Sequence, residues 1–173
     1  MSIPNIDNPI DLFKTWFDEA QRCGLREPSA MCLSTCAPGA GPSSRMVLLK
    51  SVDDLGFVFY TNLESDKGRE IAASDRVALC FHWPQTKVQI RIEGRATPVT
   101  DAEADAYFAS RPRGSQIGAW ASAQSEIVAS REELEKAFAD VEKRYAGRDV
   151  PRPPHWSGFR VAPERIEFWF GRD

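Results

Sequence analysis

The chain has 173 residues, of which 42% are hydrophobic and 10% aromatic, enough for one domain with a substantial core. Its formal net charge of −3 argues against a nucleic-acid-binding protein that works through a broad basic surface. No stretch is apolar for the length of a membrane span, and the first residues lack the pattern of a signal peptide. We expect a soluble, cytoplasmic, single-domain protein (residues 1–173) without nucleic-acid or membrane partners.

The first part of the chain predicts one helix followed by a block of strands. Asn8-Pro9 opens a segment with apolar residues at helical spacing, which predicts an amphipathic helix over about 9–23. A second, short helix capped by Ser65 is expected over about 66–73. Strands are predicted at 30–36, 44–50, 57–61, 76–83 and 87–97, which are separated mostly by Gly, Pro, Asn and Asp.

The last third of the chain predicts two more helices and a final pair of strands. Capping-box sequences begin at Thr100 and Ser130, so helices are expected within about 100–145. A proline-rich segment follows, and 158–161 and 165–170 have strand character. With barrel strands at about 30–97 and 158–170, the fold class predicted is mainly β with flanking helices (α+β), as a barrel or a sandwich.

Four cysteines stand at positions 23, 32, 36 and 80. They form no C-x-x-C pair and only two histidines accompany them, so we expect no metal site. The even spacing of Cys32 and Cys36 would point both to one face of a strand. We interpret them as reduced cysteines of the core.

The hexapeptide Arg45-Met-Val-Leu-Leu-Lys50 carries a cation at each end of an apolar run. As a strand it would separate its two ends by about 16 Å, roughly the length of a flavin mononucleotide (FMN). The alternative is a strand whose end residues simply extend into water. Regular alternation would also put the two cations on opposite faces, so a shared ligand needs a twist or a bulge. Lys67 and Arg69, near the start of the helix predicted at 66–73, add cations where a helix N-terminus would suit an anion.

Five further blocks accompany this hexapeptide, at 56–62 (GFVFYTN), 89–94 (QIRIEG), 107–116 (YFASRPRGSQ), 117–125 (IGAWASAQS) and 167–169 (EFW). In order and spacing, from about residue 11 to 172, the blocks closely resemble the pyridoxine/pyridoxamine 5′-phosphate oxidase family. The resemblance implies an FMN-binding split β-barrel of Greek-key type. It also implies a homodimer with one FMN at each of two inter-subunit sites.

The resemblance assigns flavin contacts to Arg45, Met46, Val47, Leu48, Leu49, Lys50, Tyr60, Thr61, Lys67, Gln89, Gln124, Ser125 and Trp169. It assigns the phosphate of a vitamin B6 substrate to Lys50, Tyr107, Arg111 and Ser115. Tyr107 and Arg111 are four residues apart, so one helix face would bring them together, with Ser115 just beyond the helix end. Taken alone, several of these residues have simpler explanations: a solvated sheet face for Gln89, a loop surface for Gln124 and Ser125, core for Trp169, and a solvated helix end for Arg111.

The reaction that the resemblance implies is FMN-dependent oxidation of pyridoxine or pyridoxamine 5′-phosphate to pyridoxal 5′-phosphate, with O2 reduced to H2O2. The flavin would carry the chemistry, so no dedicated nucleophile is needed. Lys50 is the candidate catalytic residue, because it would lie where flavin and substrate meet.

Three departures from the family pattern leave alternatives open. Asp66 and Val88 stand where the family commonly has basic residues, which predicts weaker FMN binding unless Arg69 compensates. The family's Arg-Leu-His-x-Arg segment after Glu-Phe-Trp is absent from the sequence, which we interpret as a shortened form of a normal oxidase. The alternatives are a related flavin oxidoreductase with another substrate, as in phenazine-type biosynthesis, or a low-turnover carrier of flavin or pyridoxal phosphate.

Overall fold

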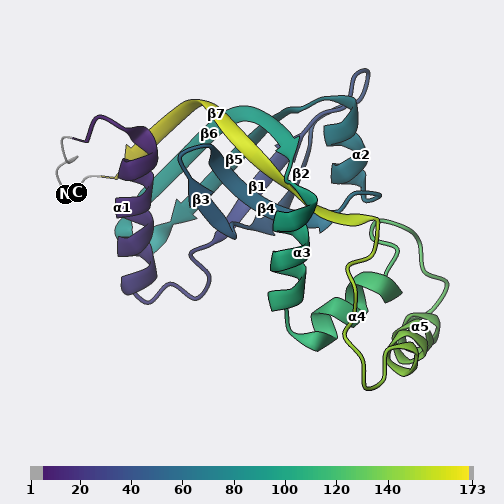
Figure 1. Ribbon diagram of the computed structural model, residues 1–173. Coiled ribbons are helices and arrows are strands. Elements are labelled where there is room, and N and C mark those ends of the chain that lie inside the picture. Colours follow the sequence, from purple (N-terminus) through teal and green to yellow (C-terminus); the bar gives the residue numbers. More distant parts are fainter. Residues whose placement is uncertain (1–5, 172–173) are drawn as a thin grey trace.

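The computed structural model describes residues 6–171, which form one curled antiparallel sheet with helices at its ends and on one side (Figure 1). The seven strands have the order β2-β1-β5-β6-β7-β4-β3. They are β1 (Ala30–Thr35), β2 (Ser43–Leu48), β3 (Ser51–Asp53), β4 (Gly56–Asn62), β5 (Arg76–Trp83), β6 (Val88–Pro98) and β7 (Trp156–Phe170). The helices are α1 (Pro9–Arg22), α2 (Asp66–Ala73), α3 (Asp101–Ser110), α4 (Arg113–Ala121) and α5 (Arg131–Arg144), and a 3-10 turn, η1, spans Pro84–Thr86.

The sheet curls so far that the two ends of its strand order approach one another. The Lys50 N–H donates to the carbonyl oxygen of Val58 (2.8 Å), which joins the segment after β2 to β4 at the other end of the strand order. The result is the half-barrel of a split β-barrel, so the predicted fold class is confirmed. Among residues 6–171 no helix has both the length and the apolar character needed to cross a bilayer.

The main core lies inside the curl, where α1 covers one end of it. Asn8 caps this helix through a hydrogen bond from the Ile10 N–H to its Oδ1 (2.9 Å). The ring of Phe13 is fully buried and lies 4.8 Å from Phe57 and 5.0 Å from Phe81 in edge contacts. A second core cluster joins α3, α4 and α5 to the first residue of β7. The molecule therefore has a barrel part and a helical part that meet where β4 and β7 pair.

The predicted strand pair at 158–161 and 165–170 is one continuous strand, β7, which pairs with β6 along its length. The register shifts between Glu93 and Gly94, and Gly94 faces Pro163. Such a bulge accommodates a proline, which has no N–H to donate. A Cβ at Gly94 would lie 2.2 Å from the Ala162 carbonyl oxygen, so this position needs glycine. The sequence suggested a break because the prolyl segment resembles a turn.

Two helices were predicted after the strand block, and the structure has three, α3, α4 and α5. Residue 110 ends α3, Arg111 has extended backbone angles (φ −72°, ψ 148°), and α4 begins after Pro112. Proline disfavours helical geometry in the residue before it, so the chain turns at Arg111. Tyr107 and Arg111 therefore do not share a helix face, and Ser115 lies on a helix of its own. Residues 51–53, which lie between the strands predicted at 44–50 and 57–61, form an additional short strand, β3.

The prediction that Cys32 and Cys36 belong to the core is wrong, whereas their reduced state is as predicted. Cys23 and Cys36 are exposed, Cys32 and Cys80 are half-buried, and all four are free thiols. The buried side of β1 carries Met31, Leu33 and Thr35 instead. The predicted single domain includes residues 1–5 and 172–173, which lie outside the described part of the chain.

Candidate functional site

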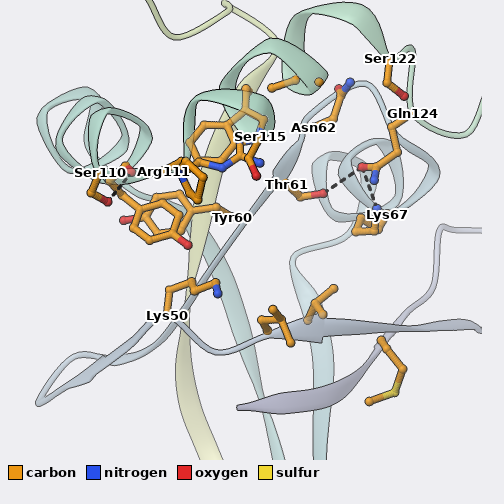
Figure 2. Close-up of a pocket in the computed structure, with 18 residues that line it drawn as sticks. Lys50, Tyr60, Thr61, Asn62, Lys67, Ser110, Arg111, Ser115, Ser122 and Gln124 are labelled. Atoms are coloured by element: carbon orange, nitrogen blue, oxygen red, sulfur yellow. Dashed lines mark hydrogen bonds between the residues drawn. The ribbon is translucent and has the colours of Figure 1, made fainter. Parts of the chain in front are cut away.

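A cavity of about 670 Å³ opens between the barrel part and the helical part. Strands β2 and β4 form one wall, and α2, α3 and α4 with the loops that follow them contribute the others (Figure 2). Its lining residues are Met46, Val47, Leu48, Lys50, Tyr60, Thr61, Asn62, Lys67, Tyr107, Ser110, Arg111, Pro112, Ser115, Gly118, Ala119, Ser122, Gln124 and Trp156. Three of these described lining residues are cations and none is acidic, so the cavity is suited to anionic ligands.

One end of the cavity is built around Lys67, in the first turn of α2. Its side chain is buried, and its Nζ donates to Ser65 Oγ (3.2 Å) and to Gln124 Oε1 (3.1 Å). Thr61 Oγ1 donates to the same amide oxygen (3.3 Å), so side chains from β4, α2 and the loop after α4 meet here (Figure 2). Burial, and next the charge of Arg45, hold the pKa of Lys67 below its ordinary value. A buried lysine with neutral partners retains capacity for an anion.

The other end is built around Arg111, at the turn between α3 and α4. Among residues 6–171, Arg111 Nη1 is the one fully buried side-chain nitrogen or oxygen without a hydrogen-bond partner. The guanidinium carbon lies 4.7 Å from the ring centroid of Trp156 and 5.6 Å from that of Phe108. Burial lowers the pKa of Arg111. A buried donor without a partner is costly, so this nitrogen marks a place for a ligand acceptor.

A stack of aromatic rings forms the wall between the two ends. The rings of Tyr60 and Tyr107 are nearly parallel (12°) with centroids 4.0 Å apart. Trp156 continues the stack, with its ring 5.4 Å from that of Tyr60 at 5°. Such a flat apolar wall suits a planar ring system of a ligand.

Lys50 lies opposite this wall, just beyond the end of β2 (Figure 2). Its side chain is exposed and makes no hydrogen bond or ion pair with the described residues, whereas its backbone N–H is fixed by Val58. Because β2 ends at Leu48, the regular alternation that would set Arg45 and Lys50 on opposite faces does not extend to Lys50. Lys50 is therefore free to contact a ligand.

Eleven of the residues predicted to bind flavin or substrate line the cavity, and five do not. Arg45, on β2, does not line the cavity; its side chain makes an ion pair with Glu70 (2.9 Å) and hydrogen bonds with Thr35 and Ser43. Leu49 is 5% exposed and belongs to the main core. Their predicted flavin contacts stay predictions, although the charge of Arg45 reaches Lys67 as described above.

The other three residues outside the cavity lie in two places. Ser125 is next to the Lys67 end, where its Oγ accepts a hydrogen bond from the Asp66 N–H (3.2 Å). Gln89 and Trp169 are cross-strand partners on β6 and β7, and Trp169 is 55% exposed. The simpler interpretation of Trp169 as core therefore does not hold.

Arg69 was the candidate to compensate for Asp66. It instead makes ion pairs with Asp66 (2.7 Å) and with Glu126 (3.3 Å), and it does not line the cavity. Arg69 therefore ties α2 to the segment that carries Gln124, and its own charge is already matched by carboxylates.

Sequence reasoning missed several lining residues, among them Asn62, Ser110, Ser122 and Trp156. Asn62, Ser110 and Ser122 fall inside the blocks that carry the family resemblance, but no role was assigned to them. Trp156 follows a proline-rich segment and has no distinguishing pattern in the sequence. Among residues 6–171 no group of three or more His, Cys, Asp or Glu side chains is arranged to hold a metal ion.

The curled sheet and the cationic cavity beside it define a split β-barrel protein with a pocket for anionic, ring-containing ligands. A model of the pyridoxamine 5′-phosphate oxidase family matches residues 17–145, and the chain belongs to that family. Pyridoxine/pyridoxamine 5′-phosphate oxidase of Rubrobacter xylanophilus is 58% identical over 96% of this chain and 76% of its own length. The enzyme of the same name from Myxococcus xanthus strain DK1622 is 57% identical over 96% of this chain and 81% of its own.

Two solved structures share the fold. PhzG from Burkholderia lata 383, in complex with tetrahydrophenazine-1-carboxylic acid, is 34% identical with a TM-score of 0.91, over 96% of this chain and 81% of that chain. A pyridoxamine 5′-phosphate oxidase-related, FMN-binding protein from Nostoc punctiforme PCC 73102 is 15% identical with a TM-score of 0.72, over 97% and 86%. The second likeness concerns the fold alone.

Proposed function

We propose that this protein oxidises pyridoxine 5′-phosphate or pyridoxamine 5′-phosphate to pyridoxal 5′-phosphate with FMN as cofactor and O2 as the electron acceptor. The observation that carries the proposal is the cavity with Lys67 at one end, Arg111 at the other, Lys50 as a third lining cation and no carboxylate among its described lining residues. Cofactor and substrate each have one phosphate and one planar ring. Two cationic ends joined by a ring-lined wall match that pair of ligands, and about 670 Å³ is within the usual range for small-molecule sites.

The residues at the Lys67 end fit the phosphate and ring of FMN. Lys67 supplies a charge-assisted hydrogen bond, and Thr61 and Gln124 supply neutral groups. Arg45 does not line the cavity, but its charge adds positive potential at Lys67, and its ion pair with Glu70 fixes its guanidinium. When bound, the flavin supplies the redox chemistry, by taking a hydride from the substrate and passing electrons to O2 with release of H2O2.

The residues at the Arg111 end orient the substrate. Arg111, Tyr107 and Ser115 hold its phosphate, and the free Nη1 of Arg111 gains the acceptor that it lacks. Held in this way, the substrate would be fixed in the cavity, so that the reaction would take place between pre-positioned groups. Lys50, unpaired among the described residues and opposite the aromatic wall, carries the charge that steers the ligands where they meet.

We also propose a homodimer in which Gln89 and Trp169 complete the site of the second copy. They lie together where β6 begins and β7 ends, and not in the cavity of their own chain. A half-exposed tryptophan beside a polar amide is the kind of surface that an interface buries.

The PhzG similarity supports a second candidate, an oxidoreductase acting on a reduced phenazine carboxylic acid. The higher identity to the oxidases, at 57–58%, favours the vitamin B6 substrate.

The deciding experiment is to purify the protein, load it with FMN and measure H2O2 release with each vitamer phosphate and with tetrahydrophenazine-1-carboxylic acid. We expect a yellow protein that oxidises a vitamer phosphate and not its unphosphorylated form. A protein that binds no FMN would refute every flavin function, and oxidation of the phenazine acid alone would establish the second candidate.

A further inference from the structure

The half-buried cation Arg111, whose Nη1 is fully buried, has no counter-ion among residues 6–171. No ion pair joins it to any carboxylate among residues 6–171, and its Nη1 has no partner at all. A guanidinium in such a place loses hydration, which is also why its pKa is lowered. Something else must keep this side chain in place when no ligand is bound.

Aromatic faces surround the guanidinium in place of a carboxylate. Its central carbon lies 4.7 Å from the ring centroid of Trp156, which is closer than its 5.6 Å distance to Phe108. The face of an indole attracts a cation more strongly than other rings do, and the attraction is greatest where water is excluded. A ring contact also differs from an ion pair in its consequence, because it leaves the N–H groups and the positive charge available to a phosphate.

Trp156 is itself held rigidly. It is 6% exposed, it lies nearly parallel to Tyr60 (5°) and Tyr107 (8°), and Phe108 contacts its ring at an edge (5.0 Å, 70°). Its backbone pairs with Asn62 at the start of β7, and its carbonyl oxygen accepts from Arg152 Nη1 (2.8 Å). The indole is therefore held in one orientation by contacts with both the barrel part and the helical part.

We propose that Trp156 is a positioning residue for the substrate phosphate: its indole holds the Arg111 guanidinium at the cavity end with donors free. This inference rests on the proposed function for the identity of the phosphate ligand. It assigns to Trp156 a part in substrate affinity that is separate from the part it has in the second core cluster.

Another tryptophan in the same cluster provides the control. Trp120 packs against the same buried residues and lies 5.7 Å from the guanidinium carbon of Arg144, but it does not line the cavity. Replacing Trp120 by leucine loosens the helical part without touching Arg111. A difference between the two tryptophans therefore separates positioning from general stability.

The experiment compares Trp156→Phe, Trp156→Leu and Trp120→Leu in the FMN-loaded protein. We expect Trp156→Leu to raise the KM for pyridoxine 5′-phosphate about tenfold with kcat within about twofold, whereas Trp156→Phe stays within about threefold. The Kd for pyridoxal 5′-phosphate, measured by titration without turnover, should rise by the same factor. In an Arg111→Ala background, Trp156→Leu should have no further effect on KM, because its partner is gone.

Several outcomes would overturn the inference: equal KM increases in Trp156→Leu and Trp120→Leu, no rescue by phenylalanine, or the full effect persisting without Arg111. If Trp156→Leu does not fold, Trp156→Met provides the same comparison with a longer apolar side chain. A protein that oxidises no vitamer phosphate, but whose pyridoxal 5′-phosphate affinity falls tenfold in Trp156→Leu alone, would refute the proposed function and support this inference. Oxidation of a vitamer phosphate with the same KM in Trp156→Leu and wild type would support the proposed function and refute this inference.

Discussion

The two ends of the cavity hold a cation in different ways: Lys67 is buried, and Arg111 is half-buried. Lys67 is surrounded by neutral oxygen acceptors, Ser65 Oγ and Gln124 Oε1, whereas Arg111 is surrounded by rings and has a nitrogen without any partner. Polar partners keep a cation solvated without cancelling its charge, and rings fix its plane without using its donors. Each cation therefore stays available to an anion: hydrogen bonds hold it on the barrel side, and aromatic packing holds it on the helical side.

The largest effect is expected from removing the cation at the helical end. Arg111→Ala should raise the KM for pyridoxine 5′-phosphate about 100-fold, because hydrogen bonds to a charged group are lost from a buried site. The affinity for FMN should stay unchanged if the two ends serve different ligands. Steady-state kinetics and FMN titration check this, with Arg144→Ala as the control, since Arg144 is an exposed arginine that also contacts a ring. A fall in FMN affinity without a change in KM would exchange the assignments of the two ends.

A smaller effect is expected at the barrel end. Lys67→Met should raise the Kd for FMN about 30-fold and leave the KM for the vitamer phosphate unchanged once FMN is saturating. The loss of FMN affinity is partial because Arg45 still contributes positive potential at this end of the cavity. Fluorescence titration of FMN measures it, and Lys143→Met, at an exposed lysine of α5, is the matched control. Equal FMN affinity in wild type and Lys67→Met would remove Lys67 from the cofactor site.

The smallest effect concerns pH and tests whether Lys67 acts as a charge. Burial lowers the pKa of Lys67 from the ordinary 10.5, and an anion binds only its protonated form. FMN affinity should therefore fall by a few fold as the pH rises through the alkaline range, beginning below the pH at which an ordinary lysine loses its proton. In Lys67→Arg the guanidinium stays charged and the decrease should flatten. Parallel curves for the two proteins would show that another group titrates.

The two ends also differ in how much of them the sequence predicted. At the barrel end, the spacing of Ser65 before Lys67 predicted a capped helix over 66–73, and the structure has that helix with the Ser65 cap. Local hydrogen-bonding preferences decide such a feature, so a short segment contains the information. At the helical end, Tyr107, Arg111 and Ser115 were predicted to converge by helix spacing, and they line one cavity although α3 ends before Arg111. The three residues therefore do come together, but the continuous helix from which their convergence was predicted is not present.

The sequence by itself determined the alternation of strands and helices, the caps, and the ordered blocks whose resemblance indicated the family. Periodicity and capping depend on residues a few positions apart, which is why these features can be predicted locally. Only the tertiary structure decided that Arg45 pairs with Glu70, that Arg69 pairs with carboxylates, and that Trp156 contacts Arg111. Apart from the Arg69–Asp66 pair, which is three positions apart on one helix, these contacts join residues 25 to 57 positions apart, and only the packing of sheet against helices sets their distances.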